Sequence, residues 1–504
     1  MAEGVTGDAV WWEQGRIKAV GPALELSRRV SSSVPSFELP GALITPGFVD
    51  GHTHFAMWAM GRRRVQLSGA PTRAAAVGRV ARAGVTQGWV LGQGWDANGW
   101  AEVPDRTSLD AVQAAPVYLD SLDVHAAWVN TAALARAGIT RETLDPFGGR
   151  IVRDAEGEPT GVLLERAVEL IHPYLPEPPD AELDAAILDA QAEAHRLGIT
   201  GIHNVEGEVA LTALERLEAS GLLRLRVLFH PPVASLHSLI ARGARSGTGS
   251  PWLRLGGVKL FLDGSLGTRT AWMLEPYVGS RDRGMPITSG QEAADAVRAA
   301  AAAGIAATVH AIGDAAVRRA LDLLTLLPRV DVPHRIEHFQ CVSDQDLARA
   351  AAAALVVSMQ PAHLLADIPL VDRHWGVRGR GAYAFATLRR RGTPMVFGSD
   401  APVASIDPRE GLYAAIERRD VEGAPAGGWR PEERLSFVDA VHAYTVGAAV
   451  AGGVAHRSGT LAPGQDADLV AWSFDPAIQR GVGQAVRAGH ARLTVVAGEV
   501  VMQR

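Results

Sequence analysis

Two histidines at the end of an apolar segment have the spacing of a metal-ligand pair. Segment 42–49 is apolar apart from Thr45 and Pro46, which predicts a β-strand, and it leads into His52 and His54. Side chains alternate between the two faces of an extended chain, so both imidazoles point the same way. Imidazole nitrogen is a common ligand of zinc and related metals. The pair predicts half of a metal site, although a His-x-His pair also arises by chance.

A second chemical signal is a lysine in a chain that otherwise uses arginine. Of 49 basic residues only Lys18 and Lys259 are lysine, and Lys259 lies inside the apolar segment 257–262. A cation is costly in such surroundings. Arginine cannot lose its proton in a protein, whereas a buried lysine can become a neutral amine. The sequence therefore predicts that an amine is needed at this position.

Three further residues with metal-binding or acid–base side chains follow apolar segments, namely His310, His338 and Asp400. A single histidine at the end of a strand is often a hydrogen-bonded core residue instead of a ligand. Several such residues on strand ends that meet at one edge of a sheet favour a shared site. We expect these three to lie near the first histidine pair.

The segments that carry these residues alternate with helical patterns, which is typical of parallel βα units. Eight strands are predicted, centred on 42–49, 199–203, 225–229, 256–262, 305–309, 335–339, 355–359 and 394–398. One helix is predicted over 181–197, with Asp180 as its N-cap and Gly198 as its stop. Eight strands with intervening helices predict an α/β protein with a (β/α)8 TIM barrel, whose active site lies at the C-terminal strand ends.

The rest of the chain divides around this barrel, which we expect to span residues 46–454. The stretch at about 60–180 is too long for one crossover helix, and we interpret it as an inserted subdomain that caps the barrel mouth. Short strand patterns with glycine turns occur at both ends of the chain. Residues 1–45 and 455–504 are therefore predicted to form one small composite β-sandwich domain.

These residues together suggest a two-metal hydrolytic site. A neutral Lys259 can take up carbon dioxide to form a carbamate that bridges two ions. The first histidine pair would hold one ion, with Asp400 as a further ligand, and His310 with His338 the other. Bridging water would lose a proton near neutral pH and attack a carbonyl. Asp400 would act as general base and then pass the proton to the leaving amine.

Motifs along the chain resemble those of the metal-dependent amidohydrolase superfamily. They occur at 46–54 (PGFVDGHTH), 94–96, 123–130, 259–267, 335–339 and 398–402 (GSDAP). The similarity is closer to the YtcJ-like subgroup, which includes N-substituted formamide deformylases. It implies hydrolysis of C–N bonds and a composite β-sandwich built from both termini. Asn204 stands where the subgroup often has an acidic residue, so no role for His203 or Asn204 is carried over.

Substrate contacts are predicted at six residues. The resemblance indicates the pocket-lining residues Trp95, Asp96, His125 and Trp128 in the insertion, for which internal packing of the cap is the alternative. Arg269 and Trp272, just after the lysine strand, are candidates for a carboxylate-binding guanidinium and an aromatic wall. Stabilisation of their loop is the competing interpretation. Cys341 has no marked base beside it and is expected to be a buried inert thiol.

Composition limits the remaining function classes. A net charge of −6 provides no basic surface for nucleic acid or polybasic membrane anchor, and no apolar run is long enough to span a membrane. A single cysteine excludes an internal disulfide, and we expect a cytoplasmic protein that acts on a small molecule, with a homodimer as the candidate assembly. The leading hypothesis is a C–N hydrolase of N-substituted formamides or N-acyl compounds with two zinc, iron or manganese ions. The alternatives are a one-metal deacylase or related hydrolase of this superfamily, and a non-catalytic scaffold derived from the fold.

Overall fold

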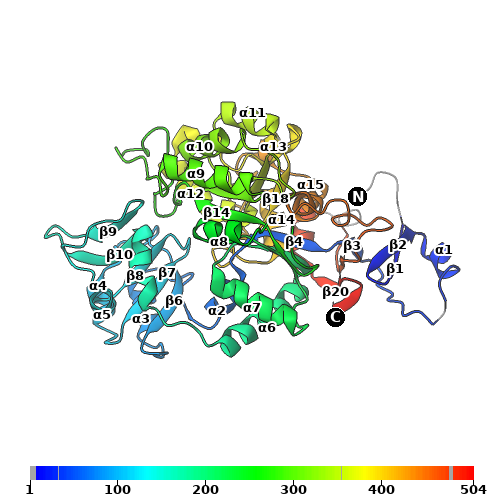
Figure 1. Cartoon of the computed structure of the whole chain (residues 1–504), viewed down its shortest axis with the longest axis horizontal. Helices are drawn as coiled ribbons and strands as arrows, with labels where there is room; N and C mark the ends of the chain where they lie inside the picture. Colours follow the sequence, from blue (N-terminus) through cyan, green and yellow to red (C-terminus); the bar gives the residue numbers. More distant parts are fainter. Residues whose placement is uncertain (1–6, 32, 354, 476–480) are drawn as a thin grey trace.

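A computed structural model describes residues 7–31, 33–353, 355–475 and 481–504 of the chain. Parts of the predicted terminal domain, residues 1–6, 32 and 476–480, lie outside this description. Two parallel sheets form the centre of the molecule (Figure 1). One has the order β13-β12-β11-β4 and the other β14-β15-β16-β17-β18. Their strands are β4 (Phe48–Thr53), β11 (Ile199–Asn204), β12 (Arg226–Phe229), β13 (Leu253–Leu255), β14 (Gly257–Phe261), β15 (Ala306–Ala311), β16 (Arg335–His338), β17 (Val356–Met359) and β18 (Met395–Phe397).

The two sheets are joined at both edges by backbone hydrogen bonds. On one side the amide of Lys259 in β14 donates to the carbonyl of Pro231 after β12, at 2.8 Å. On the other, the amide of Asp400 donates to His52 at 2.7 Å, and that of His54 to Ala401 at 2.9 Å. Seven of the eight predicted strands have a counterpart in these sheets, the predicted first strand enters them only at its end, as β4, and β13 is a short extra strand. The ends of β4 and β18, far apart in sequence, therefore lie side by side.

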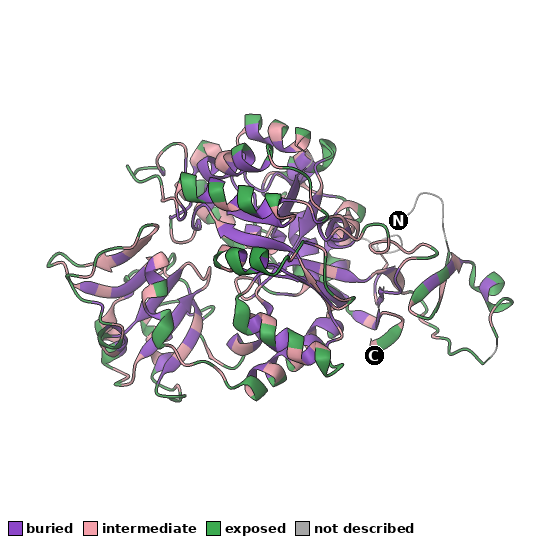
Figure 2. Ribbon diagram, in the orientation of Figure 1, coloured by how far each residue is buried: buried purple, intermediate pink, exposed green. Residues whose placement is uncertain are grey.

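Helices follow the strands, which confirms the α/β class. They are α6 (Asp180–Arg196), α7 (Glu208–Ala219), α8 (Leu236–Ala241), α9 (Gly290–Ala302), α10 (Asp314–Leu324), α11 (Asp344–Ala352), α12 (Pro361–His374), α13 (Phe385–Arg390), α14 (Pro408–Glu417), α15 (Phe437–Tyr444) and α16 (Val446–Ala451). Figure 2 shows that buried residues follow the central strands while the outward helix faces are exposed. Strands covered on both faces read as continuous apolar runs, as observed here.

Helix α6 shows how the local pattern forms an element. Leu183, Ile187 and Ala194 are buried on one face, as the helical period predicts. The predicted N-cap residue of this helix is wrong. Pro179 is the N-cap, and Asp180 is the first helical residue and makes no capping hydrogen bond. Its carboxylate still lies in the first turn, where a negative charge stabilises the positive end of the helix dipole.

The predicted first strand is two strands that belong to different sheets. β3 (Leu43–Pro46) pairs with β19 (Leu469–Trp472), and β4 begins two residues later. Between them, a Cβ on Gly47 would lie 2.2 Å from the Thr200 side chain, so only glycine fits. Sequence periodicity could not reveal this change of partner, because both halves are equally apolar.

Segments from both ends of the chain lie together. A four-stranded sheet has the order β21-β20-β19-β3, with β20 (Ala491–Val496) and β21 (Glu499–Gln503). The hairpin of β1 (Ala9–Glu13) and β2 (Arg16–Gly21) bonds to the segment that leads into β19: the Ile17 amide donates to the Gln465 carbonyl at 2.9 Å. Apolar side chains of the hairpin and the sheet, such as Trp12 and Leu493, belong to one cluster.

The stretch between β4 and α6 contains a separate six-stranded sheet, on the left in Figure 1. Its strands, in sheet order, are β5 (Val65–Gln66), β6 (Val90–Trp95), β7 (Val117–Ser121), β8 (Ala126–Val129), β10 (Pro159–Glu165) and β9 (Gly149–Arg153). We call this sheet and its short helices the cap. Within the described residues, none of the helices has the length and apolar character that a membrane crossing requires.

Candidate metal centre

Two histidines from the end of β4 meet an aspartate from the loop after β18. The Nε2 atoms of His52 and His54 lie 3.3 Å and 3.2 Å from Asp400 Oδ1. One ligand atom from each residue lies within 4.8 Å of the other two, the spacing of a group that can hold a metal ion. Asp50 holds the two segments in register, because its carboxylate accepts from the amides of His52 (3.1 Å) and Ser399 (2.9 Å).

The His52 ring is oriented by a buried ion pair. Its Nδ1 makes a short hydrogen bond to Glu337, which in turn pairs with Arg335, and all three side chains are fully buried. Burial, together with the Lys259 amine, lowers the pKa of His52 to about 4 against the opposing carboxylates. A neutral ring that donates from Nδ1 keeps its Nε2 lone pair free, and this buried atom has no hydrogen-bond partner among the described residues. A metal ion fits such an atom, and the carboxylate–histidine arrangement is common in metal sites.

A second group includes a residue that the sequence did not indicate. His338 Nδ1 and His363 Nε2 lie 4.0 Å and 3.9 Å from Asp400 Oδ2, and these three residues also have metal-ligand spacing. His338 Nδ1 is buried and lacks a hydrogen-bond partner in the described part of the chain. His363 lies in the first turn of α12, beyond the end of β17, and its Nε2 contacts the Ser399 carbonyl at 3.2 Å. A histidine at a helix start has no local pattern that marks it as a ligand.

His310 lies beside this group but does not belong to either one. Its ring centroid is 4.4 Å from that of His338, and its Nε2 donates to the Gly264 carbonyl at 3.2 Å. Its Nδ1 is buried and finds no partner in the described residues. Burial and the neighbouring His338 hold the pKa of His310 well below its usual range. The two rings are neighbours, but His310 is in neither group of metal-ligand spacing, so its pairing with His338 on one ion stays a prediction.

Lys259 lies in β14 with only 3% of its surface exposed. Burial lowers the pKa of its amine to about 8 despite the nearby carboxylates of Glu337 and Asp400. Its Nζ lies 4.7 Å from the centre of the Phe261 ring, and no ion pair joins it to a described carboxylate. These surroundings suit an amine that is neutral for part of the time at neutral pH.

Two of the candidate ligands have unusual backbone conformations. His338 and Asp400 have φ values of 68° and 59°, in the left-handed region that non-glycine residues rarely adopt. Such conformations cost about 1–3 kcal/mol each and cluster at functional sites. The strain places both side chains at the sheet edge and is consistent with a functional role for this edge.

The cap contributes one of the predicted pocket residues to this centre. The ring of His125 lies 5.2 Å from that of His310, and its Nδ1 is 2.8 Å from Glu165 at the end of β10. Burial opposes the charged form of His125, but the Glu165 carboxylate outweighs it and raises the pKa to about 9. Thr270, in the loop after β14, also bonds to Glu165. The cap and this loop therefore meet beside the candidate ligands.

The two predicted cap tryptophans are internal residues. Trp95 and Trp128 are buried in the cap core, with ring centroids 6.2 Å apart. Their indole nitrogens donate to the carbonyls of Leu119 and Asp105, at 2.9 Å each. Since neither side chain reaches a cavity described below, their placement supports the alternative of cap packing.

The other predicted contacts are also away from the ligand groups. Asp96 is exposed and bonds to Asn98 in its own loop. Arg269 is exposed, and Trp272 packs against the main core while its backbone amide donates to Asp263 at 2.8 Å. These contacts favour loop stabilisation.

Asn204 and His203 have structural partners. Asn204 Oδ1 accepts from the amide of Phe55, at 2.8 Å, which starts helix α2 (Phe55–Gly61) directly after His54. His203 Nδ1 bonds to Arg335 at 2.9 Å. Cys341 is buried, which raises its thiol pKa and agrees with an inert role.

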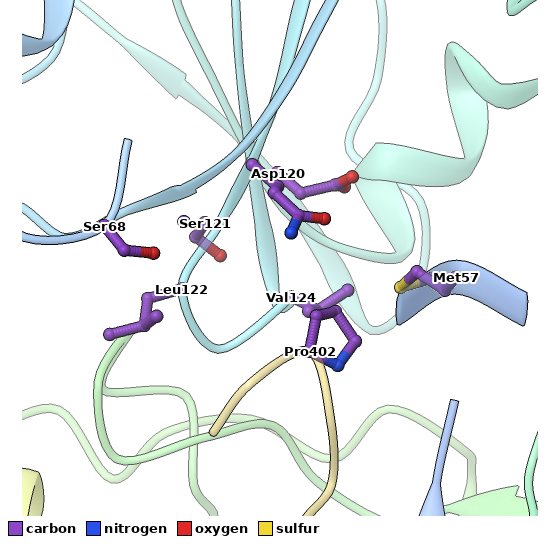
Figure 3. Close-up of a pocket in the computed structure, with 9 residues that line it drawn as sticks. Met57, Ser68, Asp120, Ser121, Leu122, Val124 and Pro402 are labelled. Atoms are coloured by element: carbon purple, nitrogen blue, oxygen red, sulfur yellow. The ribbon is translucent and has the colours of Figure 1, made fainter. Parts of the chain in front are cut away.

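Two cavities adjoin the centre. The larger, of about 440 Å³, is lined by His54, Lys259 and residues of α2 and α7. The smaller, of about 10 Å³, lies where the cap loop meets the loop after β18. Figure 3 shows Asp120, Ser121 and Val124 of the cap close to Pro402 and to Met57 of α2. The cap therefore meets the loop after β18 two residues beyond Asp400.

Comparisons with known proteins give a consistent result. A model of the amidohydrolase family matches residues 37–502. The chain is 32% identical to YtcJ of Bacillus subtilis (strain 168), over 94% of this chain and 92% of YtcJ. It is 26% identical to an N-substituted formamide deformylase of Arthrobacter pascens, over 93% and 90% of the two chains. A crystal structure of an uncharacterized metal-dependent hydrolase from Pyrococcus horikoshii OT3 superposes with a TM-score of 0.77 at 28% identity, over 93% and 94% of the chains.

Proposed function

This chain belongs to the amidohydrolase family, and we propose that it hydrolyses the C–N bond of an N-substituted formamide or another N-acyl small molecule with the help of divalent metal ions. One observation carries the proposal. Buried imidazole nitrogens of His52, His310 and His338 lack hydrogen-bond partners among the described residues. His52 and His338 lie in groups of metal-ligand spacing that share Asp400, and the ring of His310 lies beside that of His338. Unpaired buried nitrogen is costly unless something binds it. A metal ion satisfies several of these atoms at once.

The donor set suits two ions, for which zinc, iron and manganese are the candidates. His52, His54 and Asp400 would hold the first. His310 and His338, as the sequence predicts, would hold the second, and His363 lies within the same reach of Asp400. A carbamate on Lys259 would bridge them. When bound, such ions lower the pKa of water and polarise a carbonyl group.

Asp400 has the properties of the general base and acid. Although burial raises its pKa, the histidines around it outweigh this and hold the pKa well below the usual range, so it is a carboxylate at neutral pH. It accepts the proton of the attacking water and transfers it to the departing amine nitrogen. The Nε2 atom of His54 lies 3.2 Å from one of its oxygens and helps to hold it in place.

We further propose that the two central sheets close into a (β/α)8 barrel over 46–454, with a cap at about 60–180. The edge hydrogen bonds of Lys259 and Asp400 support closure. Residues 1–45 and 455–504 would then form the composite β-sandwich, in keeping with the contacts between β1, β2 and the terminal sheet.

One-metal hydrolysis is the closest alternative, because both candidate ligand groups share Asp400. In that case Lys259 would have a structural role only. A non-catalytic scaffold is disfavoured by the strained backbone at His338 and Asp400, which a protein without a site at this edge would not need to retain.

Metal analysis and a substrate panel test the proposal together. We expect about two ions of zinc, iron or manganese per chain and release of formate or another acid from N-substituted formamides or N-acyl amines. One ion would favour the mononuclear alternative, and none would favour the scaffold. Absence of hydrolysis across the panel in a metal-loaded protein would refute the amide assignment.

The carbamate is tested separately with the two lysines of the chain. Lys259→Arg should abolish bridging and most of the activity, since a guanidinium cannot form a carbamate. Lys18→Arg is the matched control, because Lys18 is an exposed residue of β2. Retention of activity in Lys259→Arg would disprove the carbamate.

A further inference from the structure

The larger cavity lies between helices α2 and α7, away from the cap tryptophans. Its inner end is formed by His54, Lys259 and His230, and it has a volume of about 440 Å³, within the range of small-molecule sites. The apolar residues around it come from α2, α6, α7 and the adjoining loops: Ala56, Met57, Met60, Pro178, Leu183, Val205, Val209, Ala210 and Pro232. A candidate metal ligand and the buried lysine thus open onto an apolar space.

Two charged residues that line this cavity, Glu206 and Arg64, have protein partners, and a third, Glu208, lies exposed at the start of α7. Glu206 accepts from the amides of Ala56 (2.9 Å) and Met57 (2.7 Å) at the start of α2. Arg64 lies 3.7 Å from Asp120 of the cap. The wall therefore favours a neutral, apolar group.

Val209 shows that this wall is accessible. It is the second residue of α7 and 51% exposed, although it faces the cavity. A large apolar side chain on an open cavity wall provides contact area for a ligand.

The inner end of the cavity presents one hydrogen-bond donor. His230 Nδ1 accepts from the Gly257 amide at 2.9 Å, which places the ring proton on Nε2. His230 is fully buried, and its Nε2 has no partner in the described residues. An unpaired buried N–H is costly, so an acceptor from a bound molecule would be stabilising there.

We propose that this cavity binds the apolar substituent of the amide substrate and that the His230 N–H donates to a polar atom of that substrate. The inference rests on the proposed hydrolysis and assigns the substrate class: neutral amides with an aryl or branched alkyl group. Binding energy from the substituent holds the amide bond next to His54. The cap tryptophans are internal and do not take part.

The test narrows the cavity at Val209 and compares a large substrate with a small one. In Val209→Phe, kcat/KM for N-benzylformamide should fall about 10-fold or more relative to N-methylformamide, the scale of a steric change in an apolar pocket. Val438→Phe is the matched control, because Val438 is also the second residue of a helix and is 50% exposed. Equal changes for both substrates, or the same change in the control, would overturn the cavity assignment.

A binding measurement separates this inference from the hydrolytic one. Metal-depleted protein should bind N-benzylformamide in calorimetry, and Val209→Phe should weaken that binding while Val438→Phe leaves it unchanged. If binding follows this pattern but no loaded protein hydrolyses the compound, the proposed reaction fails and the cavity assignment stands. If metal-depleted wild-type protein does not bind the compound, the cavity assignment fails.

His230 is tested by loss and rescue of the donor. His230→Leu should raise KM about 10-fold or more, because the substrate acceptor is left unpaired, whereas His230→Gln retains an N–H and should keep KM within about 3-fold of wild type. Equal KM values in the two variants would overturn the contact. Loss of bound metal in His230→Leu with unchanged KM would show that the donor serves Lys259 instead.

Discussion

Removal of the Glu337 carboxylate should weaken metal binding while the fold persists. Glu337 contacts the His52 ring nitrogen and the Arg335 guanidinium, and all three side chains have no solvent exposure. Full removal would leave Arg335 unpaired, at a cost of about 3–5 kcal/mol, a large share of the 5–15 kcal/mol of a typical domain. Glu337→Gln keeps the volume and one acceptor oxygen, so we expect a smaller loss of about 1.5–3 kcal/mol.

The metal affinity of Glu337→Gln should fall about 10- to 100-fold, which corresponds to about 1.4–2.8 kcal/mol. The physical reason is the His52 tautomer. A carboxylate can only accept from Nδ1 and therefore leaves Nε2 free, whereas an amide can also donate to Nδ1 and so stabilise the form with the proton on Nε2. Equilibrium dialysis against zinc with elemental analysis measures the affinity, and denaturant unfolding of metal-depleted protein measures the stability.

Glu165→Gln is the matched control, because Glu165 forms the same kind of pair with His125, which is outside both ligand groups. It should change the zinc affinity by less than about 3-fold. A 10- to 100-fold fall in affinity is expected only when the lost carboxylate orients a residue that itself binds the metal. Unchanged zinc affinity in Glu337→Gln, or an equal loss in both variants, would refute the argument that Glu337 orients a metal ligand.

Three further predictions concern other parts of the molecule. His363→Ala should lower zinc affinity at least about 10-fold if His363 is a ligand beside Asp400, and unchanged metal content would show that it is not. His195 is buried in α6, which lowers its pKa from 6.5 to about 4, so the unfolded chain binds a proton that the folded chain does not, and stability falls as the pH decreases through this range. Between pH 7 and 5 this loss is about 2 kcal/mol, and denaturant unfolding of His195→Gln should show less of it. Thr270→Val should destabilise the protein by about 1–3 kcal/mol, because Glu165 and the Ser265 amide lose their buried partner; an unchanged unfolding midpoint would contradict this.

Local patterns in the sequence determined the central elements and most of the candidate ligands. Apolar runs with β propensity mark the strands, and the polar residue that ends each run lies at the sheet edge because parallel strands align their carboxyl ends. His52, His54 and Asp400 are brought together as expected. Lys259 was informative from the sequence alone, because burial lowers the pKa of a lysine amine and so makes a neutral form accessible. A buried arginine would keep its charge.

Other features depend on contacts between distant segments, for which no local pattern exists. His363 reaches Asp400 because α12 starts beside the end of β18, and His230 faces a cavity only because α2 and α7 leave space there. A tryptophan has the same local signature in a core and in a pocket wall, and packing of the cap sheet decided that Trp95 and Trp128 are internal. The sequence alone determined which functional groups are present and which strand each of them follows. Only the tertiary structure decided which of these groups lie next to one another.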